Sequence, residues 1–269
     1  MALKDTKALP NFFSSTGKVF SFFIFLGKRA KRTRLFLLIS FLPIIMASVI
    51  KFIQYFKQDV PGHNISIFSN LIMVFYLQFL ILILALFFGT SVCSEEIEGK
   101  TLTYLSTRPV PKSALILGKF SAYSLLMILM INIGVIFSFV ILNVNILLDF
   151  SLYKILFRDM GVLTLGLICY TAFFTFIGTF LKKSILFGLI FSFGWESIIQ
   201  YFPGTTQRFT IVHYLKSLLP QTGGSFSFLI FRLDPSAPGT AVITLFLITC
   251  IFLGLACLVF SQKEYILEV

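Results

Sequence analysis

Residues 67–92 read IFSNLIMVFYLQFLILILALFFGTSV, and this stretch decides the fold class. It contains no charged residue, and its apolar side chains run on continuously. A helix needs about 20 such residues to cross the ~30 Å hydrocarbon core of a bilayer. Strands of a membrane β-barrel would alternate apolar and polar residues instead. The stretch therefore predicts a membrane-spanning α-helix.

The composition of the whole chain agrees with this prediction. Of 269 residues, 57% are hydrophobic, 17% aromatic and only 12% charged, whereas soluble domains are about 25% charged. The mean hydropathy is +0.95, and there are 35 phenylalanines. A water-exposed surface would not tolerate so much apolar area. These values disfavour a soluble enzyme, a disordered chain and a disulfide scaffold, and they predict an all-α polytopic membrane protein.

Six stretches are long and apolar enough to cross the membrane, and they form one transmembrane domain over residues 35–260. They lie at residues 35–53, 67–92, 117–142, 160–181, 184–202 and 238–260. Pro43 is expected to kink the first span. Only Lys182 and Lys183 separate the fourth span from the fifth, which predicts a tight helical hairpin.

The basic residues predict the orientation. With both termini in the cytoplasm, 15 of the 22 Lys and Arg residues fall on the inner side. Loops rich in Lys and Arg remain cytoplasmic in membrane proteins. We therefore expect an N-terminal segment 1–34 and a tail 261–269 inside the cell, in the cytoplasmic membrane.

The N-terminal segment contains a predicted amphipathic helix over residues 11–30. Val19, Phe23 and Leu26 follow helical spacing, and a basic run from Lys28 to Arg34 comes directly after them. An apolar face beside cations suits the inner membrane surface and its anionic lipids. The net charge of +11 is therefore attributed to lipids and topology, and no nucleic-acid partner is expected. The alternative is a solvated basic tail.

The polar loop 94–109 is the most informative cytoplasmic segment. Ser94 is expected to cap a short helix, with Glu95, Glu96 and Glu98 in its first turn. The sequence RPVP at 108–111 would end that helix. Two interpretations are open, a docking helix for a partner protein or an ordinary solvated loop helix.

The fifth span and the loop after it hold the candidate site in the outer half of the membrane. Glu196 is the only acidic residue within the six predicted spans, and buried charge in a bilayer is costly. It would act as a pathway or external gate residue, or be a structural carboxylate paired with Arg208, His213 or a backbone amide. Trp195 is interpreted as an interfacial anchor or a substrate contact. Residues 203–237 are expected to form short helices that dip back into the membrane.

Three segments resemble one family of transport proteins. EEIEGKTLTYLSTRPVPKSALILGK (95–119), FGWESIIQYFPGTTQRFTIVHYLKSL (193–218) and the ending FSQKEY (260–265) are similar to type-2 ABC transporter permeases, also called type V exporters. The resemblance is strongest to the single-domain permeases grouped with multicopper-enzyme maturation. It covers the whole chain and implies export as the transport direction.

The resemblance implies how such a chain would work. Two copies would form a dimer above two separate ATPase subunits, and the helix in the loop 94–109 would couple them. The coupling role is carried over to Glu95, Glu96, Glu98, Gly99, Lys100, Thr101, Tyr104, Arg108 and Pro109, and the N-terminal helix near 18–30 would be the elbow helix. ATP and Mg²⁺ would bind the partner, since this chain has no G-x-x-x-x-G-K-[ST] motif. No catalytic residue and no metal site are expected here.

Two alternatives belong to other classes of protein. Glu95-Glu96 with Lys100 nearly matches the E-E-x-x-x-R motif of prenyl-protein proteases, but the expected topology places His213 on the other side of the membrane. Ligands of a water-activating metal must lie within a few ångströms of each other. The second alternative is a membrane assembly scaffold without transport. The substrate stays open among lipids, peptides, drug-like amphiphiles and copper- or sulfur-related species.

Overall fold

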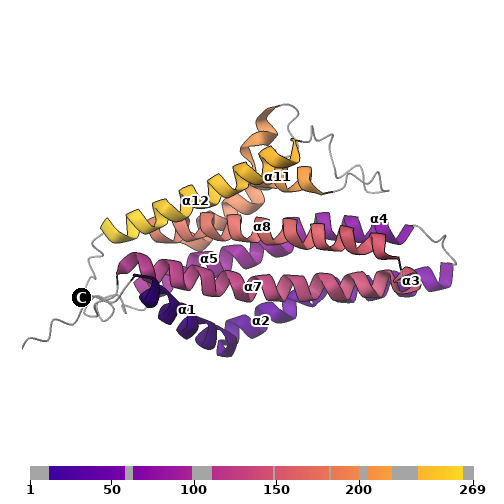
Figure 1. The fold of residues 1–269 in the computed structure, drawn as a ribbon, viewed down its shortest axis with the longest axis horizontal. Helices are drawn as coiled ribbons and strands as arrows, with labels where there is room; N and C mark the ends of the chain where they lie inside the picture. Colours follow the sequence, from indigo (N-terminus) through magenta and orange to yellow (C-terminus); the bar gives the residue numbers. More distant parts are fainter. Residues whose placement is uncertain are drawn as a thin grey trace, which may run out of the picture.

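The computed structural model describes residues 12–57, 63–98, 111–147, 149–181, 183–199, 205–219 and 236–262. Within these ranges every regular element is a helix (Figure 1). The elements are α1 (Phe12–Arg29), α2 (Lys31–Ser40), α3 (Leu42–Lys57), α4 (His63–Asn70), η1 (Leu71–Leu80), α5 (Ile81–Glu98), α7 (Lys112–Leu142), η2 (Val144–Ile146), α8 (Phe150–Phe180), α9 (Ser184–Leu189), η3 (Ile190–Glu196), α10 (Ser197–Ile199), η4 (Thr205–Phe209), α11 (Ile211–Leu218) and α12 (Pro238–Gln262).

Five helical stretches among the described residues are long and apolar enough to span a membrane. They cover 31–56, 65–94, 112–142, 150–180 and 238–262, so the chain is an all-helical, multi-pass membrane protein. The predicted span 184–202 forms a shorter apolar helix over Ser184–Ile199. The sixth span and the orientation of the termini stay predictions.

The long helices α5, α7, α8 and α12 run side by side along the longest axis of the molecule (Figure 1). The start of α7 lies toward the same end of the molecule as the ends of α8 and α12, and the end of α7 and the start of α8 lie toward the opposite end (Figure 1). Helix α5 packs mainly against α8 in the core, and α12 covers another side of α8. Large buried apolar side chains of α5, α7 and α8 fill the core, among them Leu84, Phe88, Met127, Leu163 and Phe174.

The first span is broken in the middle, as Pro43 predicts. Helix α2 ends at Ser40, and α3 begins at Leu42 after a turn at Phe41. Proline has no N–H, so position 43 cannot donate the hydrogen bond that would continue the helix. Beyond the break, the Lys51 ammonium donates a hydrogen bond to the Leu142 carbonyl at 3.1 Å. This bond joins α3 to the last turn of α7, where a cation suits the helix dipole.

The fourth span is longer than predicted, because α8 begins at residue 150 and not near 160. Asp149 caps this earlier start by accepting a hydrogen bond from the Ser151 N–H at 3.1 Å. Asp159 therefore lies inside the helix and is fully buried. The expectation that Glu196 is the only acidic residue within a span was wrong for this reason.

The N-terminal helix is confirmed as α1, and part of its apolar face packs against α7. The Phe23 ring meets the Tyr123 ring edge to face at 6.2 Å. A Cβ atom at Gly118 would lie 2.6 Å from a Val19 methyl carbon, so the two helices touch closely. α1 and α2 form a V beside α7 (Figure 1). The position of α1 at a membrane surface stays a prediction.

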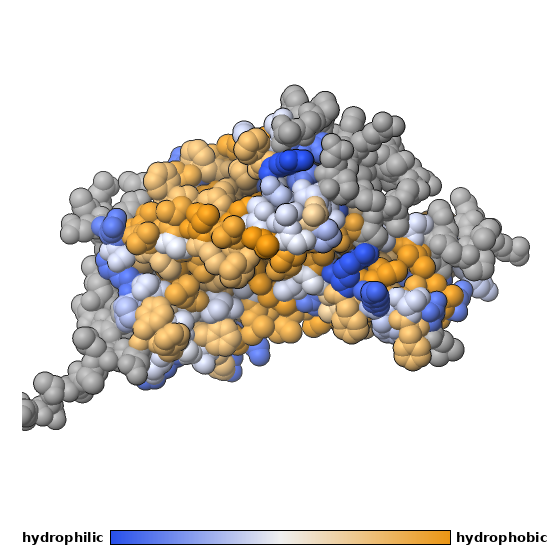
Figure 2. Space-filling model, turned by 45° about the horizontal axis from the view of Figure 1, so that its top comes forward, coloured by the Kyte–Doolittle hydropathy of each residue, from blue (hydrophilic) through white to orange (hydrophobic). Residues whose placement is uncertain are grey.

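The surface carries the apolar area that a bilayer would cover. Hydrophobic residues occupy much of the described surface in the view of Figure 2, and hydrophilic residues form smaller separate patches between them and at the left end. Helix α12 contributes a set of exposed side chains that includes Val242, Ile243, Phe246, Leu247, Ile251, Leu255 and Leu258. So much exposed apolar area marks a membrane or protein contact.

Candidate functional site

The predicted docking segment begins on a continuation of α5. This helix runs without a break through Ser94 to Glu98, so Ser94 does not cap a new helix. The prediction failed because no glycine or proline separates the second span from Ser94. The backbones of Glu95, Glu96 and Glu98 are helical. The other predicted coupling residues lie outside the described residues, and these are Gly99, Lys100, Thr101, Tyr104, Arg108 and Pro109.

Two basic side chains meet at Ser91, one turn before the acidic residues of α5. The Arg32 guanidinium donates to the Ser91 hydroxyl at 3.0 Å, and the Lys119 ammonium donates to the Ser91 carbonyl at 3.4 Å. The side chain of Lys119 is only 1% exposed. Arg32 comes from α2, Ser91 from α5 and Lys119 from α7, so this basic cluster connects three helices.

Aromatic rings surround the basic cluster. The Arg32 guanidinium carbon lies 4.9 Å from the centre of the Phe88 ring, and the Lys119 ammonium lies 4.8 Å from the centre of the Phe23 ring. Cations in such positions are attracted to the negative face of a ring. The sequence analysis missed this cluster. Its signal was a lysine at 119 and an aromatic residue at 123, one turn apart in the third span.

At the other candidate site, Glu196 is buried and holds the start of α11. Its carboxylate accepts hydrogen bonds from the backbone N–H groups of Ile211 at 3.1 Å and Val212 at 3.4 Å. The side chain is 1% exposed. Such a carboxylate satisfies helix N–H groups that have no partner within the helix. Of the alternatives left open by the sequence, the structure shows the pairing with backbone amides.

The π-helix η3 carries Glu196 to this position at its last residue. π-helical turns are rare and often occur at functional sites. Tyr170 of α8, fully buried, lies beside the carboxylate. Lys216 of α11 is also buried, and desolvation lowers its pKa to about 8, an effect that the charge of Glu196 opposes. Sequence reasoning had named neither Tyr170 nor Lys216.

Helix α11 is held on further sides as well. The Thr210 hydroxyl accepts a hydrogen bond from the His213 N–H at 3.3 Å and caps the helix. The His213 ring nitrogen Nε2 lies 3.0 Å from the Ser236 hydroxyl, just before α12. A Cβ atom at Gly166 of α8 would lie 2.8 Å from Leu215. The segment 203–237 thus contains a short helix fixed to η3, α8 and the start of α12.

Trp195 points away from this arrangement, although it is the neighbour of Glu196. Its side chain is 51% exposed, on the apolar outer surface of η3. Its roles as an interfacial anchor or as a substrate contact both stay predictions. Among the described residues, no three His, Cys, Asp or Glu side chains gather where they could hold a metal ion.

Comparison with known proteins assigns the chain to a family. The family model of the ABC-2 family transporter proteins matches residues 28–195, which include the basic cluster, the acidic end of α5 and most of η3. The comparison with curated proteins gave no match. The matched region covers more than half of the chain, and its helices are those of a multi-pass membrane protein. The chain therefore belongs to the ABC-2 transporter family and is a permease component of an ABC transporter.

Proposed function

We propose that this permease is a homodimeric exporter of the cytoplasmic membrane, driven by two separate ATPase subunits that dock on the segment 94–109. The observation that carries the proposal is the continuity of α5, which leads from the buried core directly to Glu95, Glu96 and Glu98. A rigid helix of this kind transmits a displacement at its end into the core. In this proposal the six spans follow from the lengths of the apolar stretches, and the cytoplasmic termini follow from the positive-inside rule.

The partner subunits supply the chemistry in this proposal. ATP and Mg²⁺ bind the ATPases, because the sequence of this chain has no phosphate-binding loop. The basic cluster passes their movement on. Ser91 lies one turn before the acidic end of α5, and its contacts to Arg32 and Lys119 connect that end to α2 and α7.

Glu196 belongs to the external gate in this proposal. Its carboxylate connects the fifth apolar helix to α11, so α11 follows any movement of η3. The Glu196 carboxylate thus holds η3 and α11 together. A contact between Glu196 and the transported molecule is not required, since the side chain is buried against backbone amides.

The proposed substrate is an amphiphile. Aromatic rings from three helices meet around Phe173, whose ring centre lies 4.3 Å from that of Phe191 and 4.9 Å from that of Phe252. Such rings offer apolar area and stacking to a molecule with a hydrophobic part. Mass spectrometry of molecules retained by the purified dimer would identify the substrate class.

Capture of the ATPase tests the docking role. Reversal of Glu95 and Glu96 to Lys should weaken ATPase binding by about 1–3 kcal/mol, because it places the wrong charge at the contact. Gly99→Pro should weaken binding further by preventing a helical continuation. Glu264→Lys in the tail 261–269 is the matched control, with a charge reversal on the same side of the membrane.

The readouts are pull-down of the ATPase and permease-dependent ATP hydrolysis in nanodiscs. All variants should insert and dimerise, because the changes lie outside the apolar spans. Undiminished capture and hydrolysis with both the charge reversal and Gly99→Pro would show that the ATPase docks elsewhere.

A further inference from the structure

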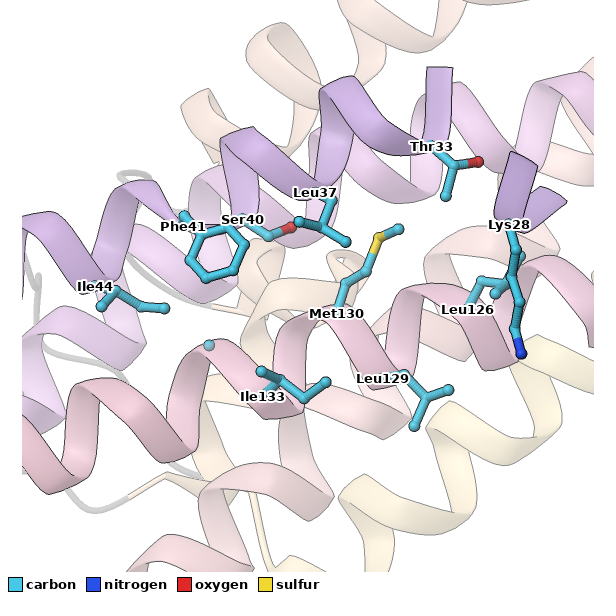
Figure 3. A pocket seen from close by; sticks show the side chains of 11 residues that line it. Lys28, Thr33, Leu37, Ser40, Phe41, Ile44, Leu126, Leu129, Met130 and Ile133 are labelled. Atoms are coloured by element: carbon cyan, nitrogen blue, oxygen red, sulfur yellow. The ribbon is translucent and has the colours of Figure 1, made fainter. Parts of the chain in front are cut away.

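An apolar groove lies between the broken first span and α7. It has a volume of about 240 Å³. Thr33 and Leu37 of α2 line one wall, and Leu129, Met130 and Ile133 of α7 line the other, with Lys28 of α1 at one end (Figure 3). The groove is open on its outer side, where the bilayer would lie. Its walls are mostly apolar, and the polar residues that line it are Lys28, Thr33 and Ser40, whose hydroxyl donates to the Phe36 carbonyl.

The polar end of the groove has the features of an anion site. Helix α2 starts there after Ala30, whose extended backbone is followed by helix N–H groups without a side-chain cap. The start of a helix attracts anions through these N–H groups and the helix dipole. The Thr33 hydroxyl lies in the first turn, is 4% exposed as a residue, and has no hydrogen-bond partner in the structure. Lys28 adds an exposed ammonium at the same end.

The length of the groove corresponds to one leaflet of a bilayer. The wall from Thr33 to Ile44 spans 11 residues, or about 16 Å along the first span. Half of the ~30 Å hydrocarbon core is about 15 Å. The basic residues around the joint would lie at the membrane surface, and Ile44 near the bilayer centre.

We propose that this groove binds one anionic phospholipid of the inner leaflet. The headgroup phosphate accepts hydrogen bonds from the first turn of α2, the Thr33 hydroxyl and the Lys28 ammonium, and an acyl chain lies between Leu37 and Ile133. This inference rests on the membrane placement proposed above. The lipid contacts α1, α2 and α7 at once, so it stabilises the joint beside the basic cluster and makes the permease sensitive to membrane composition.

Native mass spectrometry of the purified full-length chain, without any ATPase, tests this site. Palmitoyl-oleoyl phosphatidylglycerol and phosphatidylcholine, which have the same acyl chains, are titrated separately. The phosphatidylglycerol should bind about tenfold more tightly, since charge-assisted hydrogen bonds are stronger than neutral ones. Lys28→Gln combined with Thr33→Val should remove this preference. Lys18→Gln, an exposed lysine of α1 outside the groove, should leave it unchanged.

A second pair of variants tests the apolar part. Leu129→Trp should fill the groove and weaken the binding of both lipids, whereas Leu125→Trp, on α7 but outside the groove, should not. Equal binding of the two lipids, or a preference that survives Lys28→Gln with Thr33→Val, would overturn the proposal. Loss of the dimer in Leu129→Trp with unchanged lipid binding would overturn it too and assign the groove to a second copy. Since no ATPase is present, a failure of ATPase docking would leave these results unaffected.

Discussion

Gly178 of α8 lies so close to Thr90 of α5 that a Cβ atom at position 178 would be 2.7 Å from the Thr90 carbonyl oxygen. The reverse contact is just as tight, because a Cβ atom at Gly89 would be 3.0 Å from the Thr171 carbonyl oxygen. The two helices therefore touch at their backbones in two places, at Gly178 of α8 and at Gly89 of α5. Small residues allow this approach in membrane proteins, where close packing holds helices together.

Gly178→Ala should destabilise the fold by about 1–3 kcal/mol, because the added methyl group meets backbone atoms that cannot rotate away. Gly161→Ala on the same helix is the matched control, since nothing lies within 4 Å of a Cβ atom there. Thermal unfolding in detergent would measure both. Equal unfolding temperatures of the two variants would contradict the tight packing of α5 and α8.

Glu196→Gln and Glu196→Ala should differ in their effect on α11. Glutamine keeps one carbonyl oxygen that can accept a hydrogen bond, whereas alanine leaves the N–H groups of Ile211 and Val212 without an acceptor. Each buried, unsatisfied amide costs about 1–3 kcal/mol. Hydrogen exchange at residues 211–212 should therefore rise most in Glu196→Ala. Trp195→Phe is the control for a change at the neighbouring, exposed position. Equal exchange in all three variants would show that Glu196 does not hold the start of α11.

Lys119→Met should leave ATPase capture intact but reduce permease-dependent ATP hydrolysis. Methionine keeps apolar contact with the Phe23 ring but loses the hydrogen bond to Ser91 and the cation–ring attraction, about 1–2 kcal/mol in total. Lys112→Met, at an exposed position on the same helix, is the control. If Lys119→Met hydrolyses ATP like the wild type, the basic cluster does not transmit movement.

Single cysteines should report the topology. In a background with Cys250 and Cys257 replaced by alanine, Lys112→Cys and Lys183→Cys should react with a membrane-impermeant maleimide only after permeabilisation. Thr206→Cys should react in intact cells. All three positions are exposed in the structure, so burial does not prevent labelling. Labelling of position 112 in intact cells would show that the orientation is opposite to the predicted one.

Much of the fold could be predicted from the sequence because apolar length is a strong signal in membrane proteins. The break in the first span was predicted from Pro43 alone, and the hairpin between Phe180 and Ser184 was predicted from the two lysines that separate two apolar stretches. The start of α8 was not, because Lys154 and Arg158 interrupt the apolar run and were assigned to an external loop. Their side chains are long enough to reach polar surroundings from inside a helix.

The candidate sites were predictable only in part. Glu196 attracted notice as a charge within an apolar stretch, but its partners are backbone amides 15 and 16 residues away, which carry no residue-type signal. The basic cluster joins Arg32, Ser91 and Lys119, and no local spacing connects these positions. Contacts of this kind depend on how helices pack, which periodicity along one helix does not specify.

The hydrogen bond from Lys51 to the Leu142 carbonyl has a mechanical consequence. Helix α7 begins at Lys112, directly after the proposed docking segment, and its 31 residues extend for about 46 Å to Leu142. Because the helix is continuous, it can transmit an axial displacement from Lys112 to Leu142. The hydrogen bond between Leu142 and Lys51 then transmits this displacement to α3, beyond the break at Phe41. The part of the first span beyond this break would thus follow α7 through a contact separate from the basic cluster, which connects α7 to α2.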